Sequence, residues 1–478
     1  MIVVVKSMNA LLVAQGFIFS QVESNTLDFS KESESNVEFL KKILGESDWR
    51  HGWHDRFLTV EDFDQNEAEW LALCAVPGRG RTEMCGYFDD ENCVSLEMLD
   101  LYISGLVRQL NRLGCMTIMS CDGEGKRRPI ILFATVPDVK KATVLLAEVG
   151  LKHRVNEVRK SITFLLDRNE LLDYVSLLNE LPENVKEIPH DDLERNLFEN
   201  NVEELLQIPG VSGEESVIRN HVMKKLIPLT DKISVDGYGN ILAEVTIGAN
   251  RVGPAFTILL NCHLDVVDEI ESDREILKHG NVWTSSYGIL GADDRAGIGV
   301  VLYTLKQLQM MQLQSPVKVK IAFTVKEEVG LCGAKAVSQD FLEGVQAAIV
   351  VDRRGNGDIV TGTWGTAFCD ELFGSMIALI GNLGEEKRWE PTMGGRSDTL
   401  IWAQQGIQSV NLSVGYQNEH TSEEELNIND AFATANLLKK VFLHVDLLKS
   451  ALRGIRGEAQ STDERSRRSH RKVVSAVS

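Results

Sequence analysis

The stretch from Ile321 to Ala334, IAFTVKEEVGLCGA, indicates the fold, because a short apolar run in it ends in two adjacent carboxylates, Glu327 and Glu328. The apolar run is typical of a buried strand. Successive side chains of a strand point to opposite sides, so one Glu could bind a metal while its neighbour faces a different target. A Glu-Glu pair by itself is more often a solvated turn, and the rest of the chain has to decide between these interpretations.

Other His and carboxylate residues also lie at the ends of predicted strands or in the turns that follow them. In open α/β sheets, sites form beyond the carboxyl ends of the strands. Imidazole and carboxylate together suit borderline divalent cations, and two His with three carboxylates are enough for two ions if one carboxylate bridges them. The sequence therefore predicts two divalent metal ions, Zn²⁺ first, with Co²⁺ or Mn²⁺ as alternatives. The residues are His263 and Asp265 after FTILLNC, Asp293 and Asp294 in GILGADDRAG, Asp352 after AAIVV, and His420 after VNLSVGYQNE.

Two of these carboxylates are predicted to act without binding metal. Asp265 lies two residues after His263, on the same side of an extended chain, where it could accept the second ring proton of a metal-binding His. Glu327 is then free to act as a general base that takes a proton from the attacking water and passes it to the leaving amine.

Length and composition limit the other functions. With 478 residues, the chain is expected to form two or three domains. A formal net charge of −20 argues against nucleic acid or an anionic membrane as a partner. Eight cysteines without a CxxC pair predict reduced thiols and a cytoplasmic location. No apolar run reaches the length of a membrane span, and the first 20 residues resemble a signal peptide too weakly to predict secretion.

The order of predicted strands and helices indicates an α/β protein. The larger domain is expected to form a mixed, mostly parallel sheet with helices on both faces, its last helix capped by Asn429. The smaller α/β domain, of unknown role, is expected to hold one sheet with helices on one side and a helix over 95–113. The predicted boundaries are 1–34 for an uncertain leader that includes a polar linker, 35–185 for the smaller domain, 186–194 for a linker, 195–451 for the di-metal domain, and 452–478 for a disordered basic tail.

Several motifs together give a more specific indication, although each alone is weak. They are IPGVSGEESVIRNHVMKKL, NCHLDVV, GADDRAG, KEEVGLCGA, VVDRRGNGD, GGRSDTLIWAQQGIQSVNLS and NEHTSEEELNI. This set resembles the catalytic domain of the co-catalytic zinc exopeptidases, the clan of peptidase T, bacterial leucyl aminopeptidases, tetrahedral glutamyl aminopeptidases and carboxypeptidase G2. The resemblance implies that His263 and Asp352 bind one metal, that His420 and Glu328 bind the other, that Asp293 bridges them, that Asp265 orients His263, and that Glu327 is the base.

The resemblance implies hydrolysis of a peptide or amino-acid amide, most simply by an aminopeptidase or small-peptide peptidase. An amidohydrolase or carboxypeptidase of the same clan, or a non-catalytic binding protein on this fold, is the alternative. Arg396 in GGRSD could hold a substrate carboxylate or could pair with a neighbouring acid. Only 68 positions (420 − 352) separate Asp352 from His420, which leaves no room for the lid domain of peptidase T. A homo-oligomer is compatible with all of these readings.

Overall fold

The computed structural model describes residues 7–62, 66–80, 94–248, 256–311, 313, 315–384 and 389–455. The chain forms two compact units, Met1–Glu194 and Arg195–Ser478. Helix α7 (His190–Leu206) contains the point of division. No helix among these residues is both long enough and apolar enough to span a lipid bilayer.

The first unit contains two antiparallel sheets of four strands each, with the strand orders β1-β2-β4-β3 and β5-β6-β8-β7. Its buried apolar residues come from both the helices and the strands. The strands are β1 (Ser20–Glu23), β2 (Thr26–Asp28), β3 (Arg50–His54), β4 (Phe57–Asp62), β5 (Thr117–Cys121), β6 (Ile130–Phe133), β7 (His153–Asn156) and β8 (Ser161–Phe164). The helices are α1 (Met8–Ala14), α2 (Glu34–Gly45), α3 (Glu67–Cys74), α4 (Ser104–Arg112), α5 (Val136–Glu148) and α6 (Leu171–Asn179).

The two halves of the first unit repeat the same order of elements: helix, hairpin, helix, hairpin, helix. Local contacts also repeat. Ser33 and Thr135, which are 102 positions apart (135 − 33), both cap the central helix of their half with the side-chain oxygen. Nδ1 of His51 lies 2.9 Å from the carbonyl oxygen two residues before it, and Nδ1 of His153, again 102 positions on (153 − 51), lies 2.6 Å from its own. The first unit is therefore a tandem pair of similarly folded halves, which the sequence did not indicate.

Two expectations for the first unit are wrong. The segment expected to be a polar linker forms β1 and β2, so there are two sheets where one was expected. The helix expected over 95–113 is a 3-10 turn at Leu96–Met98 followed by α4. The backbone of Leu99 is extended, and its carbonyl oxygen accepts a hydrogen bond from Nε of Arg79. A tertiary contact thus takes a backbone group that a continuous helix would have used.

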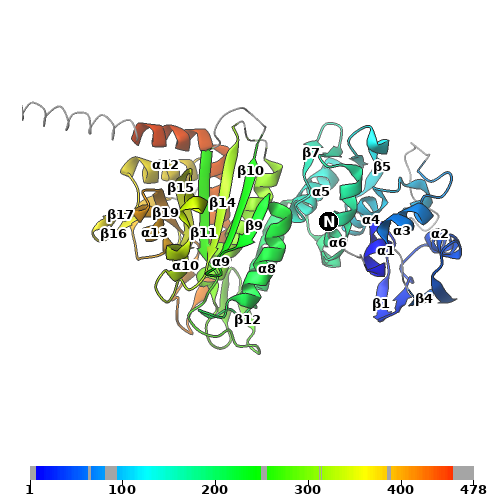
Figure 1. Ribbon diagram of the computed structural model, residues 1–478, viewed down its shortest axis with the longest axis horizontal. Helices are drawn as coiled ribbons and strands as arrows, with labels where there is room; N and C mark the ends of the chain where they lie inside the picture. Colours follow the sequence, from blue (N-terminus) through cyan, green and yellow to red (C-terminus); the bar gives the residue numbers. More distant parts are fainter. Residues whose placement is uncertain are drawn as a thin grey trace, which may run out of the picture. The chain divides into compact units, whose positions relative to one another are not determined.

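The second unit is organised around a large sheet with the strand order β17-β16-β19-β15-β11-β14-β10-β9 (Figure 1). Its four central strands are parallel, and the outer strands of this order pair antiparallel. A further strand, β18, pairs parallel to β16. This architecture confirms the predicted mixed sheet with a parallel centre. The strands are β9 (Lys232–Val235), β10 (Ile241–Ile247), β11 (Phe256–His263), β14 (Val317–Thr324), β15 (Val345–Arg353), β16 (Asp358–Thr363), β17 (Thr366–Ala367) and β19 (Gln408–Ser413), with β18 (Glu390–Met393) paired to β16.

Helices cover both faces of this sheet, as predicted. Side chains alternate along β11, so Ile258 and Leu260 join one apolar core and Leu259 joins the other. The larger core lies under α7, α8 (Ser216–Leu226), α9 (Ala292–Met310), α12 (Glu371–Gly381) and α14 (Ile428–Leu443); the smaller lies under α10 (Cys332–Ala336), α11 (Gln339–Leu342) and α13 (Asp398–Gln404). Asn427 caps α14, not Asn429 as expected, since its side chain accepts from the backbone N–H of Asn429.

A small antiparallel sheet with the order β12-β13-β21-β20 completes the second unit. The loop between β20 and β21 carries His420 and Glu424. Residues 445–455 are helical, and the predicted tail lies outside the described residues from 456 onward. The strands are β12 (Ile276–His279), β13 (Val282–Ser285), β20 (Tyr416–Gln417) and β21 (Glu425–Asn427).

Candidate metal centre

The predicted site residues meet at the carboxyl end of the central strands. His263 is the last residue of β11, Glu327 and Glu328 follow β14, and Asp352 lies near the end of β15. Because these strands are parallel neighbours, their carboxyl ends lie at the same edge of the sheet. One cavity of about 150 Å³ is lined by His263, Asp293, Glu327, Glu328, Asp352, Arg396 and His420, together with residues that were not predicted.

Asp293 stands between the two histidines. Its Oδ1 lies 3.0 Å from Nε2 of His263, and its Oδ2 lies 3.2 Å from Nε2 of His420. Burial alone would raise the pKa of Asp293, but hydrogen bonds from both histidines hold that pKa below its usual range. Each oxygen of this one carboxylate therefore faces a different imidazole, which is the arrangement that a bridging ligand requires.

A further carboxylate completes each side. Oδ1 of Asp352 lies 3.6 Å from Nε2 of His263, and Oε1 of Glu328 lies 2.9 Å from Nε2 of His420. One donor atom each from His263, Asp293 and Glu328 lies within 4.8 Å of the others. The pairwise distances thus put Asp352 beside His263 and Glu328 beside His420, with Asp293 near both histidines.

Asp294 lies close to the same residues but in a different setting. It forms a second donor group with His263 and Asp352 within 4.8 Å. Its side chain is fully buried, and its two oxygens accept from the backbone N–H groups of His263, at 3.3 Å, and Gly297, at 3.1 Å. A Cβ atom at Gly297 would lie 2.1 Å from the backbone oxygen of Val351 and 2.2 Å from Oδ1 of Asp294, so the helix approaches the sheet this closely only with glycine there. Both oxygens of Asp294 therefore accept hydrogen bonds from the backbone, whereas Asp293 lines the cavity.

The carboxylate of Asp265 lies beside His263, as predicted, and it also makes contacts that were not predicted. Nδ1 of His263 lies 3.0 Å from the backbone oxygen of Asp265 and 3.5 Å from its carboxylate. The carboxylate also accepts from the backbone N–H groups of Glu327, at 3.0 Å, and Glu328, at 3.2 Å, and from the Ser212 hydroxyl at 2.7 Å. The ring of His263 is therefore oriented mainly by a carbonyl, and the Asp265 side chain holds the loop that carries both glutamates.

The cavity concentrates negative charge. Burial and the neighbouring carboxylates raise the pKa of Glu327 to about 10, of Glu328 to about 7 and of Asp352 to about 6, although His263 lowers all three. Hydrogen bonding to Asp293 raises the pKa of His420 to about 9. Divalent cations would relieve this crowding of like charge, and imidazole with carboxylate is a donor set that Zn²⁺ accepts. The residues present therefore fit a divalent metal ion.

Sequence reasoning missed two residues that position Asp352. The hydroxyl of Tyr416 donates to Oδ1 of Asp352 at 3.0 Å. The side chain of Asn411 accepts from the backbone N–H of Asp352 at 2.9 Å and donates to its carbonyl at 2.7 Å. Both lie on β19 or the short strand after it, and only the pairing of β15 with β19 brings them to Asp352. Their nearness in sequence to His420 was the available signal.

Arg396 lies on the wall of the cavity and is exposed. Over the residues that the structure describes, its side chain makes no hydrogen bond and no ion pair, unlike Arg354 in the same wall, which pairs with Glu419 at 3.1 Å. Of the two predicted roles for Arg396, pairing with a neighbouring acid finds no support among these residues.

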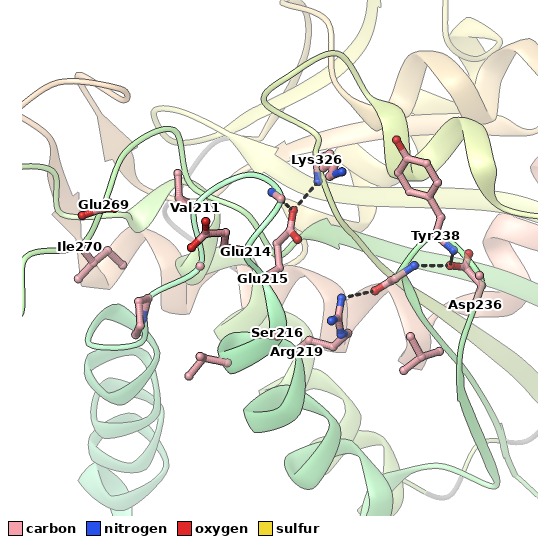
Figure 2. A pocket seen from close by; sticks show the side chains of 17 residues that line it. Val211, Glu214, Glu215, Ser216, Arg219, Asp236, Tyr238, Glu269, Ile270 and Lys326 are labelled. Carbon is pink, nitrogen blue, oxygen red and sulfur yellow. Dashed lines mark hydrogen bonds between the residues drawn. The ribbon is translucent and has the colours of Figure 1, made fainter.

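A larger cavity of about 790 Å³ adjoins the loop that leads to Glu327 (Figure 2). Glu215 accepts from the backbone N–H groups of Gly213, at 2.7 Å, and Lys326, at 3.2 Å, so it ties the start of α8 to the residue before Glu327. The lining carries both signs of charge, with Arg219 and Lys326 opposed by several carboxylates.

Part of the chain is similar to known proteins. Residues 240–442 match the model of Peptidase family M28. Peptidase T of Clostridium acetobutylicum is 30% identical over 172 residues, which is 33% of this chain and 42% of that protein. The uncharacterized protein YqjE of Bacillus subtilis is 29% identical over 147 residues, or 29% of this chain and 38% of that protein. The chain spans about two fifths of the length of these relatives. For this part of the chain, the predicted resemblance to zinc exopeptidases is confirmed.

Solved structures are similar over about half of the chain. The aminopeptidase PepT from Bacillus cereus has a TM-score of 0.45 at 17% identity, covering 53% of this chain and 99% of that one. The TET1 peptidase of Pyrococcus horikoshii, which can assemble into a tetrahedron or a large octahedral shell, has a TM-score of 0.42 at 19% identity, covering 52% and 99%.

Proposed function

We propose that the second unit, over residues 195–451, is a metal-dependent peptidase, most simply an aminopeptidase or small-peptide peptidase. One observation carries the proposal: the two oxygens of Asp293 face His263 and His420, each backed by a second carboxylate. The match of residues 240–442 to Peptidase family M28 and the similarity to peptidase T support it.

Five residues would hold two divalent ions, with Zn²⁺ the first candidate and Co²⁺ or Mn²⁺ the alternatives. His263 and Asp352 form one side, His420 and Glu328 form the other, and Asp293 is shared. Bound divalent metal supplies Lewis-acid chemistry, bringing the pKa of water from 15.7 to roughly 7 and polarising a scissile carbonyl. The protein fixes the donors: Tyr416 and Asn411 hold Asp352, and Asp265 holds the backbone of Glu327 and Glu328.

Glu327 is the proposed general base. Its backbone N–H is fixed by Asp265, whereas its side chain lines the cavity and makes no hydrogen bond or ion pair to another described residue. Nearby dications would favour the ionised carboxylate. The Glu327 carboxylate would take the proton of the attacking water and deliver it to the nitrogen of the leaving amine.

The substrate would be a short peptide or an amino-acid amide. Arg396 supports recognition of a substrate carboxylate, because it is exposed in the cavity wall without a partner among the described residues. The same feature keeps the second candidate open, an amidohydrolase or carboxypeptidase acting on N-acyl amino acids or C-terminal residues.

We infer a reducing, cytoplasmic setting from the cysteines. Cys74, Cys115, Cys121, Cys262, Cys332 and Cys369 are free thiols, and Cys74, Cys115 and Cys262 are buried. Nucleic acid and membrane are not proposed as partners, given the net charge of −20. A homo-oligomer stays a prediction.

Mass spectrometry of a peptide panel tests the function directly. Zinc-loaded full-length protein would be incubated with peptides that have free or acetylated N-termini, and Glu327→Ala would run in parallel. We expect stepwise loss of N-terminal residues from the free peptides and no cleavage by the variant. Release of acyl groups or C-terminal residues would support the second candidate, and wild-type protein that bound zinc but cleaved nothing would contradict both.

A further inference from the structure

Glu424 is a buried carboxylate near the metal centre that is not among the predicted ligands. It lies four residues after His420, in the loop between β20 and β21, and its side chain is 2% exposed. Its Oε2 accepts from the backbone N–H of Gly291 at 2.7 Å, and its Oε1 accepts from the backbone N–H of Asp293 at 3.0 Å. The Glu424 carboxylate therefore accepts hydrogen bonds from the backbone on both sides of Ala292, at the start of α9.

The backbone at this point is not held by ordinary helix geometry. Gly291 has a positive φ of 73°, and the first acids of α9 have non-helical dihedrals, with ψ at 102° for Asp293 and 36° for Asp294. N–H groups at a helix start have no partner within the helix, and a negative charge is favourable there. Glu424 supplies that partner from a distant loop, in place of the usual Ser, Thr, Asp or Asn cap.

The groups around Glu424 do not offer it another role. Two buried cations, Arg274 and Arg295, interact with its charge but donate their hydrogen bonds elsewhere: Arg274 to the carbonyl oxygens of Leu206 and Leu290, and Arg295 to those of Leu264 and Ile208. The direct partners of the Glu424 side chain are thus the backbone N–H groups of the loop that carries Asp293.

The loop that carries Glu327 and Glu328 is held in the same way. Asp265 accepts from the backbone N–H groups of Glu327 and Glu328 through its two oxygens. Glu424 accepts from those of Gly291 and Asp293. In both places, the two oxygens of a buried carboxylate accept hydrogen bonds from two backbone N–H groups. These N–H groups belong to the segments that carry the proposed ligands Glu328 and Asp293.

From this geometry we propose that Glu424 is a positioning residue, which sets Asp293 so that one oxygen faces His263 and the other faces His420. Because Glu424 and His420 belong to the same short loop, this contact also fixes the distance between His420 and Asp293. The inference rests on the proposed function, since it concerns the same metal centre. Loss of Glu424 would leave every donor in place but let the shared carboxylate turn, so the second ion would be bound more weakly.

Zinc binding by the full-length protein tests the inference. The metal-free chain would be titrated with ZnCl₂ by calorimetry, and retained zinc would be counted by plasma mass spectrometry after buffer exchange. The variants are Glu424→Ala and Glu424→Gln, with Glu423→Gln as the matched control because its neighbouring side chain is exposed. Wild type and control should bind two ions, and Glu424→Ala should weaken one of the two steps about 10–100-fold, as for other residues that support metal ligands.

Kinetics and unfolding separate positioning from simple stabilisation. With saturating zinc, kcat of Glu424→Ala should fall about 10–100-fold while KM stays within threefold, and Glu424→Gln should recover part of the loss because its amide oxygen still accepts one hydrogen bond. A lower melting temperature with both zinc steps unchanged would overturn the inference and leave Glu424 as a helix cap. If Glu424→Ala did not fold, Glu424→Gln and Glu424→Asp would carry the same test. Wild-type protein that bound no zinc would instead overturn the proposed function.

Discussion

Glu32 in the first unit and Glu327 in the second are both enclosed carboxylates, but their surroundings differ. Glu32 is 3% exposed and pairs with Nη2 of Arg108, whose distances to its two oxygens are 2.6 and 2.8 Å. Glu327 lies beside other carboxylates, and burial together with Asp352, Asp398 and Glu328 raises its pKa to about 10. Glu32 is thus matched by an opposite charge, whereas Glu327 is crowded by like charge.

This difference indicates which unit carries chemistry. A paired buried charge supports a unique fold, but breaking the pair is costly. Crowded carboxylates cost stability in the folded protein, and such groups occur where a metal or a substrate is to be bound. The same chemical change, Glu to Gln, should therefore have opposite consequences in the two units.

The largest effect is expected for Glu327→Gln. The amide keeps the shape of the side chain but cannot accept the proton of water, so kcat should fall about 10²–10⁴-fold. Zinc content should change little, because Glu327 is not a proposed ligand. Initial rates on a free-amine peptide, with plasma mass spectrometry for zinc, measure both, and Glu343→Gln on the surface is the matched control. A variant with full activity would remove Glu327 from the mechanism.

Glu32→Gln should do the reverse, lowering stability without lowering kcat. The change removes the negative charge of Glu32 that pairs with the guanidinium of Arg108, whose side chain is 4% exposed. Breaking such a pair costs about 3 kcal/mol or more. Urea unfolding followed by fluorescence should show the loss, while peptidase activity of the folded fraction stays within twofold. Equal loss of activity and stability would mean that the two units do not behave separately.

The two units also differed in how far the sequence predicted them. In the second, four of the predicted site residues follow an apolar run, so the local pattern placed His263, Glu327, Glu328 and Asp352 at or just after strand ends. Tyr416 and Glu424 escaped prediction because their partners come from other strands or from α9.

The first unit was harder to predict for a similar reason. Its two halves make the same contacts, but often with different residue types. Ser33 corresponds to Thr135, and the carbonyl groups that contact His51 and His153 belong to Trp49 and Leu151. The helical pattern near Leu99 was overridden by the contact from Arg79. Periodicity predicts elements, whereas side chains that satisfy a distant backbone group follow only from the fold.

His153, one of the two histidines that make the repeated contact, gives a smaller test through the pH dependence of unfolding. Burial lowers the pKa of His153 to about 4 from an ordinary value of 6.5, so between these values the unfolded chain binds the proton and the folded chain does not. Stability from this residue is complete above pH 6.5 and is lost as the pH falls toward 4, by up to about 3 kcal/mol. Unfolding at pH 7.5 and pH 5 should show the loss in wild type and a weaker one in His153→Gln. His51→Gln, the half-buried counterpart, is the control, and an unchanged pH dependence in His153→Gln would contradict the assignment.

Substitution of Arg396 is expected to have the smallest effect. Arg396 can be compared with Arg79 of the first unit. In the first unit, Arg79 donates to Leu99, Gln15, Cys74 and Ser104, all within its own core. Arg396, by contrast, is exposed on the cavity wall and has no such partners among the described residues. If it holds a substrate carboxylate, Arg396→Ala should raise KM about tenfold for peptides with a free C-terminal carboxylate, equivalent to about 1.4 kcal/mol, with kcat within threefold. Peptides amidated at that end should show no change, and Arg453→Ala should behave as wild type. An equal rise in KM for both kinds of peptide would show that Arg396 shapes the cavity without recognising the carboxylate.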